Sequence, residues 1–165
     1  MSNVKKSKHG FELTDVSNIL NTFGTKKVAY DANIPEVAAI YARYSGGTGN
    51  PNSFFSGATD KDIFIYAMCL GKKAGIKNEF VKKKDSNGKM KENPQESIDV
   101  AYFARDPEYF WMMLAVALTE MRDPDGEPTL DAFEPNYVLE ICQGYANYGI
   151  HELIKVYTDN NKKYL

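Results

Sequence analysis

The chain has 165 residues, 43% of them hydrophobic and 25% charged, and its formal net charge is −2. This composition is typical of a soluble globular protein, and the length is enough for one domain to bury a core without disulfide or metal staples. The lysines near the N-terminus are followed by no continuous apolar stretch, and no run approaches the roughly 18 apolar residues of a membrane span. We therefore expect no signal peptide and no membrane span, and we predict a cytoplasmic location.

The small net charge hides an internal split. Residues 72–91 carry eight lysines against two acids, whereas residues 92–157 carry thirteen acids against three basic residues. Such a split gives one folded unit two electrostatically different surfaces. It bears on partners and association, and not on the fold.

Residues 1–12 are interpreted as a flexible leader. Residues 13–23 place apolar side chains at i, i+3, i+4 and i+7, which predicts a short amphipathic helix that stops at Gly24. Pro35 suits the first turn of a second helix, which continues to Tyr44. The glycines of the next stretch, 45–53, are interpreted as a flexible linker and not as a phosphate-binding loop, because the Lys-Ser/Thr of that motif is absent.

A helix over residues 60–74 is the best local prediction in the chain. Thr59 can cap its first turn, which holds two aspartates, and its last turn holds two lysines, so sequence and helix dipole agree. Residues 63–70 are apolar nearly all round, which indicates a central, well-buried helix. Gly75 is a natural stop.

Between this helix and the acidic half, Asn87-Gly88 is a turn dipeptide with short lysine-rich arms on either side. The segment at about 79–92 is therefore expected to be either a small exposed β-hairpin or a loop.

Three further helices are predicted, over residues 96–104, 107–121 and 135–157, with Asp106 as a cap and a turn-rich connector before Pro135. The many apolar residues of 107–121 imply burial on more than one side. Two glycines in the last helix weaken it by roughly 1 kcal/mol each relative to alanine, so a bend or break near the YANYG sequence is expected there.

These elements predict a mainly α fold. We expect a single helical domain over residues 13–157, built as a bundle of five to six helices with a small hairpin at about 79–92, and a polar tail over 158–165. No internal repeat of solenoid length is visible in the sequence.

Candidate catalytic groups are few. Of the two histidines, His9 lies in the leader, and His151 has no HExxH partner, so we interpret it as an ordinary helix residue. The acidic connector resembles a calcium loop, but Pro124 and Gly126 break the motif, which favours a solvated turn. Cys69 and Cys142 lie in apolar helical patterns and are expected to be buried, reduced thiols. We predict no catalytic residue, no metal site and no cofactor.

The candidate binding residues are the lysines of the basic segment, which we define as residues 72–91: Lys72, Lys73, Lys77, Lys82, Lys83, Lys84, Lys89 and Lys91. Lysines contact phosphates without precise geometry and give salt-sensitive affinity that is independent of sequence, but the segment has no arginine for bidentate base reading. A solvated surface loop, a nucleic-acid contact, and a contact with an acidic protein, including another copy of this chain, all remain open.

Two stretches, FFSGATDKDIFIYAMCLGKKAGIK (54–77) and YVLEICQGYANYGIHELIKVY (137–157), resemble the family of DNA phosphorothioation (Dnd) system-associated protein 4. The resemblance covers 45 residues, and YANYG is its distinctive motif. The basic tail here has lysine where the family often has arginine, and residues 1–50 have no counterpart. The family has no assigned catalytic residues, so the resemblance implies only a prokaryotic accessory component of a DNA modification or restriction system.

Two hypotheses follow. In the first, the chain is a non-enzymatic accessory protein of a phosphorothioation-linked antiviral defence system that binds a partner protein, DNA or both through the basic segment. In the second, it is a structural assembly subunit of a viral or defence particle, in which the basic segment of one copy contacts the acidic half of the next, a heterologous contact that forms homo-oligomeric rings or filaments.

Overall fold

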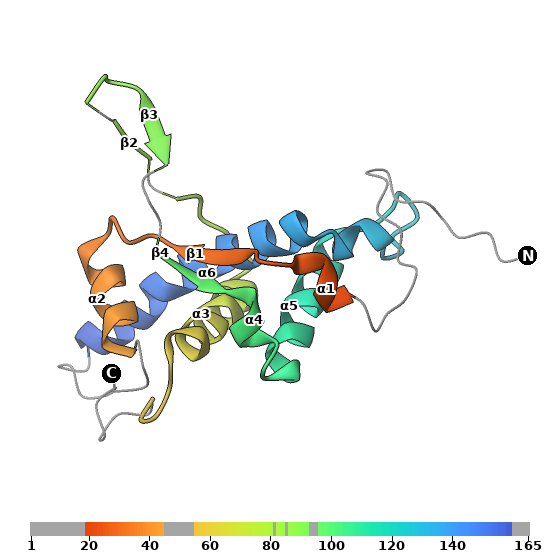
Figure 1. The fold of residues 1–165 in the computed structure, drawn as a ribbon, viewed down its shortest axis with the longest axis horizontal. Helices are drawn as coiled ribbons and strands as arrows, with labels where there is room; N and C mark the ends of the chain where they lie inside the picture. The colour runs from red at the N-terminus through yellow and green to blue at the C-terminus, as the bar shows by residue number, and fades with distance from the viewer. Residues whose placement is uncertain (1–18, 45–54, 81, 85, 93–95, 160–165) are drawn as a thin grey trace, which may run out of the picture. The chain divides into compact units, whose positions relative to one another are not determined.

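The computed structural model describes residues 19–44, 55–80, 82–84, 86–92 and 96–159. Within these ranges the chain forms six α-helices, one 3-10 helix and four short strands (Figure 1). The mainly helical fold with a small antiparallel hairpin confirms the predicted fold class. The chain divides into two compact units, the first made of Met1–Lys27 and Asp99–Cys142 and the second of Val28–Ile98 and Gln143–Leu165.

The first unit is helical. Its elements are α1 (Ile19–Phe23), α4 (Val100–Phe103), α5 (Pro107–Glu120), the 3-10 helix η3 (Leu130–Phe133) and the part of α6 (Pro135–Asp159) up to Cys142. Helix α5 contacts both α4 and η3. The ring of Phe23 meets the ring of Phe110 edge-on with 5.0 Å between centroids, a favoured aromatic geometry that ties α1 to α5.

Helix α5 buries only one stripe. Phe110, Met113 and Leu114 are buried, whereas Trp111 is 50% exposed and Met112 is 37% exposed. The buried positions follow the spacing of a single helix face. The prediction that this helix is buried on more than one side was therefore wrong, because its apolar density exceeds what its neighbours cover.

The second unit combines helices and strands. It contains α2 (Pro35–Tyr44), α3 (Asp60–Ala74), β2 (Lys82–Lys84), β3 (Met90–Glu92), the remainder of α6, and most of β1 (Lys27–Tyr30) and β4 (Glu96–Asp99). The sheets are two-stranded: β1 pairs with β4, and β2 pairs with β3. The rings of Tyr30 and Tyr41 stack with 3.8 Å between centroids, and burial raises the pKa of Tyr41 far above its usual value.

The predicted helix over 96–104 was wrong in its first half. Residues Glu96–Asp99 form strand β4, and the helix α4 begins only at Val100. The Val100 N–H donates to the carbonyl oxygen of Lys26 at 3.1 Å, and the Lys27 amine lies 3.3 Å from the Asp99 carboxylate. The strand thus depends on a partner about seventy residues away in sequence, which local periodicity cannot reveal.

Helix α3 begins and ends as predicted. The Asp62 carboxylate accepts hydrogen bonds from the Thr59 N–H at 2.6 Å and from the Thr59 hydroxyl at 2.7 Å, which fixes the first turn. Gly75 has φ of +71° and ends the helix in the left-handed region. The helix interior is buried on several sides, which confirms that α3 is a central element of its unit.

The backbones of α3 and α6 are in close contact. A methyl group built on Gly71 would overlap the carbonyl oxygen of Tyr145, and one built on Gly149 would overlap the carbonyl oxygen of Ala67. Helix α6 is continuous from Pro135 to Asp159, so of the expected bend or break near YANYG, a break does not occur. The glycine of this motif instead makes room for α3. We call this crossing the α3–α6 contact.

Some predictions fall outside the described residues. These are the leader 1–12, the first part of the helix 13–23, the linker 45–53 and most of the tail 158–165. The single domain over 13–157 stays a prediction. In the part of the chain that the structure describes, no helix is both long and apolar enough to cross a bilayer.

Both cysteines are free thiols, but their environments differ. Cys142 is buried, and its Sγ donates to the carbonyl oxygen of Met113 at 3.5 Å. Cys69 is only half-buried, so the prediction of burial was correct for one thiol alone. Partial burial raises the pKa of Cys69 above its usual value, because the thiolate is poorly solvated there.

Replacing Gly149 with alanine should destabilise the protein. Alanine favours a helix by roughly 1 kcal/mol over glycine, but the overlap with Ala67 should reverse this gain and lower the free energy of unfolding by about 2 kcal/mol. Urea unfolding followed by circular dichroism measures the difference. Gly144→Ala is the matched control in the same helix, since its methyl group would lie 3.2 Å from Lys77 Cβ, which requires a far smaller adjustment than the overlap at Gly149. Equal stability changes in the two variants would contradict the α3–α6 contact.

The thiols should react unequally with a disulfide reagent such as DTNB at neutral pH. Cys69 should react alone in the folded protein, and more slowly than free cysteine, because its raised pKa leaves less thiolate. Both thiols should react in denaturant. A Cys69→Ser variant that still reacts before unfolding would show that the buried Cys142 is accessible after all.

Candidate functional site

The basic segment starts on a helix end. Lys72 and Lys73 occupy the last turn of α3, where cations interact favourably with the helix dipole. The Gly75 N–H donates to the carbonyl of Lys72 at 3.1 Å, and the next N–H donates to the carbonyl of Gly71 at 3.2 Å. These bonds close the helix and turn the chain outward, so that Lys73 and Lys77 are exposed.

Two of the predicted lysines converge on one aromatic ring. The amine of Lys72 lies 5.1 Å from the centroid of the Tyr145 ring, and the amine of Lys77 lies 5.3 Å from it. Cation–π contacts of this kind contribute on the order of 0.5–1 kcal/mol at exposed sites. The buried Tyr145 of α6 therefore holds two positive charges close together, and sequence reasoning did not foresee this.

The chain after Lys77 is fastened to α6. The Asn78 N–H donates to the carbonyl oxygen of Gly144 at 2.9 Å, and Asn147 Nδ2 donates to the carbonyl oxygen of Asn78 at 3.4 Å. The glycine at 144 allows this approach, because its Cα lies against the stem of Lys77. Both donors come from within the second unit, so the start of the basic segment has a fixed place on α6.

The remaining lysines belong to a β-hairpin, one of the two structures expected at 79–92. Strands β2 and β3 pair antiparallel in the register Lys82↔Glu92, Lys83↔Lys91 and Lys84↔Met90. Gly88 has φ of +75°, which the turn requires, and residues 86–89, including Lys89, are exposed. The register sets two lysine positions opposite each other, an arrangement that is destabilising on its own.

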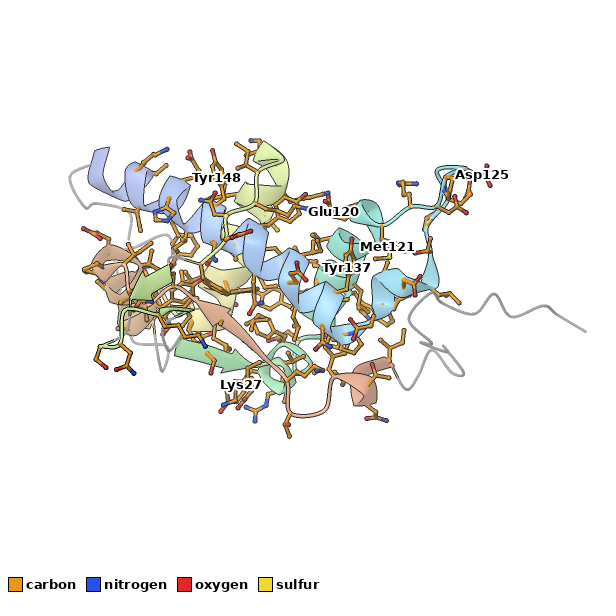
Figure 2. All side chains as sticks on the ribbon, turned by 90° about the horizontal axis from the view of Figure 1, so that it is seen from above. Lys27, Glu120, Met121, Asp125, Tyr137 and Tyr148 are labelled. Atoms are coloured by element: carbon orange, nitrogen blue, oxygen red, sulfur yellow. The ribbon has the colours of Figure 1, made fainter. Side chains whose placement is uncertain are left out.

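The acidic connector forms an ordered loop in the first unit, which we call the acidic loop and define as residues 122–128. Oδ1 of Asp123 accepts from the backbone N–H groups of Asp125 at 3.0 Å and Glu127 at 2.8 Å, and the Arg122 guanidinium donates to the carbonyl of Gly126 at 2.7 Å. Asp125 lies at the outer end of the loop (Figure 2). Asp123 thus binds the backbone of its own loop, as aspartates do in turns, and the loop does not follow the pattern of a calcium loop.

A tyrosine of the first unit lies close to acidic side chains. Tyr137 of α6 lies near Glu120 at the end of α5 (Figure 2). Its pKa is raised, mainly by burial and further by the negative charges of Glu120 and Glu140. Ten of the thirteen acids of residues 92–157 belong to the first unit, whereas the basic segment belongs to the second.

His151 has a place that the sequence did not predict. It lies half-buried on α6 and lines a cavity of the second unit together with the carboxylates of Asp31 and Glu79. Asp31 directly follows β1. The only sequence signal for its place in the cavity is that a charged residue stands between a strand and Pro35. Among the described residues, no group of three or more His, Cys, Asp or Glu side chains could hold a metal ion.

Three features are thus candidates for function: the basic segment, the acidic loop and the cavity beside His151. Lys72 and Lys77 converge on Tyr145, and Lys83 lies opposite Lys91 in the hairpin. Six of the eight predicted lysines belong to regular elements, two to α3 and four to β2 and β3. A comparison with known proteins finds no matching family model, no matching curated protein and no matching solved structure.

Proposed function

We propose that this chain is a non-enzymatic accessory protein that binds the phosphate backbone of DNA through its lysine hairpin, in association with a DNA phosphorothioation-linked defence system. The observation that carries the proposal is the register of the hairpin, in which Lys83 lies opposite Lys91. Like charges in directly opposed positions are destabilising. A phosphate group bound between these two positions would offset the unfavourable pairing.

The kind of contact follows from the residue type. Lysine is a flexible point charge that binds phosphate without reading bases, and the basic segment contains no arginine. The expected affinity is therefore independent of sequence and strongly dependent on salt. A partner protein with an acidic surface is bound by the same lysines through the same electrostatics.

The defence context is supported by the resemblance of residues 54–77 and 137–157 to the Dnd-associated family. These two stretches are far apart in sequence, yet they contain the glycines of the α3–α6 contact, Gly71 and Gly149. The resemblance thus falls on one structural feature of the second unit. A cluster of sulfur-modification genes beside this gene would support the context, and flanking genes unrelated to DNA modification would remove it.

Neutralising the hairpin should weaken DNA binding. We expect the triple variant Lys82→Gln, Lys83→Gln and Lys84→Gln to make the plot of log affinity against log salt less steep. The magnitude of its negative slope should fall by about 2 to 3, since each lost phosphate contact removes nearly one unit. Gel shifts of one duplex at several salt concentrations, with and without a phosphorothioate linkage, measure both affinity and slope.

The matched control is a triple Lys→Gln change at Lys5, Lys6 and Lys8, which alters the net charge equally. It should leave the slope nearly unchanged. An equal loss in both variants would mean that net charge governs binding and would contradict the hairpin contact, as would unchanged binding of the hairpin variant.

A second candidate function is assembly from copies of this chain. The observation that favours it is the acidic loop, whose own hydrogen bonds hold Asp125 and Glu127 at exposed positions. A lysine hairpin from another copy matches this loop in charge, and a head-to-tail contact of this kind forms rings or filaments.

Sedimentation velocity at low and high salt separates the two functions. If copies assemble, the protein should sediment as larger species at low salt and as a monomer at high salt, because screening weakens contacts between exposed charges. The double variant Asp125→Asn and Glu127→Gln should then stay monomeric at low salt. A monomer under all conditions would leave DNA binding as the supported function.

A further inference from the structure

The second unit contains a cavity of about 170 Å³ beside His151. It is lined from three segments: the turn between β1 and α2, the chain that leads from α3 towards β2, and one face of α6. Its lining residues are Asp31, Ile34, Val37, Asn78, Glu79, Asn147, Ile150 and His151. None of them belongs to the lysines of the proposed DNA contact.

Hydrogen bonds hold these three segments together. The Ala29 N–H of β1 donates to Gln143 Oε1 at 2.6 Å, which ties the strand before Asp31 to α6. The bonds from Asn78 to Gly144 and from Asn147 to Asn78 tie the chain before Glu79 to the same helix. The cavity is therefore part of the packed structure and does not depend on a loose loop.

The polar lining consists of two carboxylates, the amides of Asn78 and Asn147, and the His151 imidazole. Asp31 and Glu79 contribute the two carboxylates, and the lining includes no lysine or arginine. Asp31 is 4% exposed and Asn147 is 7% exposed, so the walls hold polar side chains inside the protein. Asn147 donates through Nδ2 to Asn78, which leaves its Oδ1 as an acceptor.

The apolar part of the lining is aliphatic. Ile34, Val37 and Ile150 offer branched side chains, and the one ring in the lining is the His151 imidazole. The volume is below the roughly 300–1,000 Å³ of pockets that hold drug-sized ligands. The cavity thus suits one short chain with a polar head, and it is too small for a nucleotide.

We propose that this cavity binds a primary ammonium or guanidinium group on a short aliphatic stem. Glu79 and Asp31 accept charge-assisted hydrogen bonds from the cationic head, Asp31 in addition to the Asn33 N–H that its Oδ1 accepts at 3.1 Å. Asn147 Oδ1 accepts a further one. The aliphatic walls cover the methylene groups of the stem, whose burial is favourable by roughly 0.8 kcal/mol for each CH₂. A free small amine and a lysine or arginine side chain of a partner protein share this chemistry.

The experiment is a titration of the isotope-labelled full chain with n-butylammonium and n-butylguanidinium chloride, followed by NMR. We expect saturable shifts of the backbone amides of Asn78 and Glu79 and of the Asn147 side-chain amide, with a Kd on the order of 1 mM for so small a ligand. 1-Butanol, which has the same stem and no charge, should give no saturable shift. Sodium chloride at equal concentration controls for ionic strength.

Variants test the assigned carboxylates. Glu79→Gln should weaken butylammonium binding at least fivefold, and because Glu79 is exposed, the variant should fold. Glu36→Gln, an exposed carboxylate of α2 outside the cavity, is the matched control and should bind as the unchanged protein does. No saturable shift with either cation, equal shifts with butanol, or equal affinity of Glu79→Gln and the unchanged protein would each overturn the proposal.

A second arm identifies the source of the cation. N-acetyl-lysine N-methylamide carries the same head and stem on a peptide backbone. Binding of this compound together with butylammonium assigns the cavity to a side chain of a partner protein, whereas binding of butylammonium alone assigns it to a free amine. Either result supports the cation site. This site is independent of the proposed DNA contact, so the hairpin Lys→Gln variant should bind butylammonium as the unchanged protein does.

Discussion

At Gly71 and Gly149 the backbones of α3 and α6 come so close that a methyl group on either residue would overlap a carbonyl oxygen. This approach fixes the distance between the two helices in the second unit. Five to six residues earlier in α6, Gln143 and Gly144 meet β1 and the chain after α3. Tyr145 meets Lys72 and Lys77. The fixed start of the basic segment and the cavity beside His151 both depend on this helix crossing.

Local signals predicted the helices well. Thr59 with Asp62, Pro35, Asp106 and Gly75 mark helix ends through effects that act within one turn, and the structure has helices beginning or ending there. Asn87-Gly88 predicted the hairpin turn for the same reason. The strands β1 and β4 could not be predicted in this way, because each has only four residues and pairs across a long stretch of sequence.

The candidate sites were less predictable than the fold. The lysines of the basic segment were visible as a charge run, but their convergence on Tyr145 depends on the α3–α6 contact. The cavity was not visible, because Asp31, Glu79 and His151 come from three distant segments, and each is unremarkable by itself. The two glycines before and at the end of YANYG were expected to weaken the helix because glycine has a low helix propensity. The role of Gly149 comes instead from its contact with the backbone of α3.

The attachment of Asn78 to α6 has a further consequence. Asn78 and Glu79 line the cavity, and they also lie on the chain that leads to β2. Glu79 is only three residues before Lys82, the first residue of β2. If an occupant of the cavity changed the affinity of the hairpin for an anion, the anion would change the affinity for that occupant by the same factor. A cation inside the protein and phosphate outside it would then be coupled across three residues of chain.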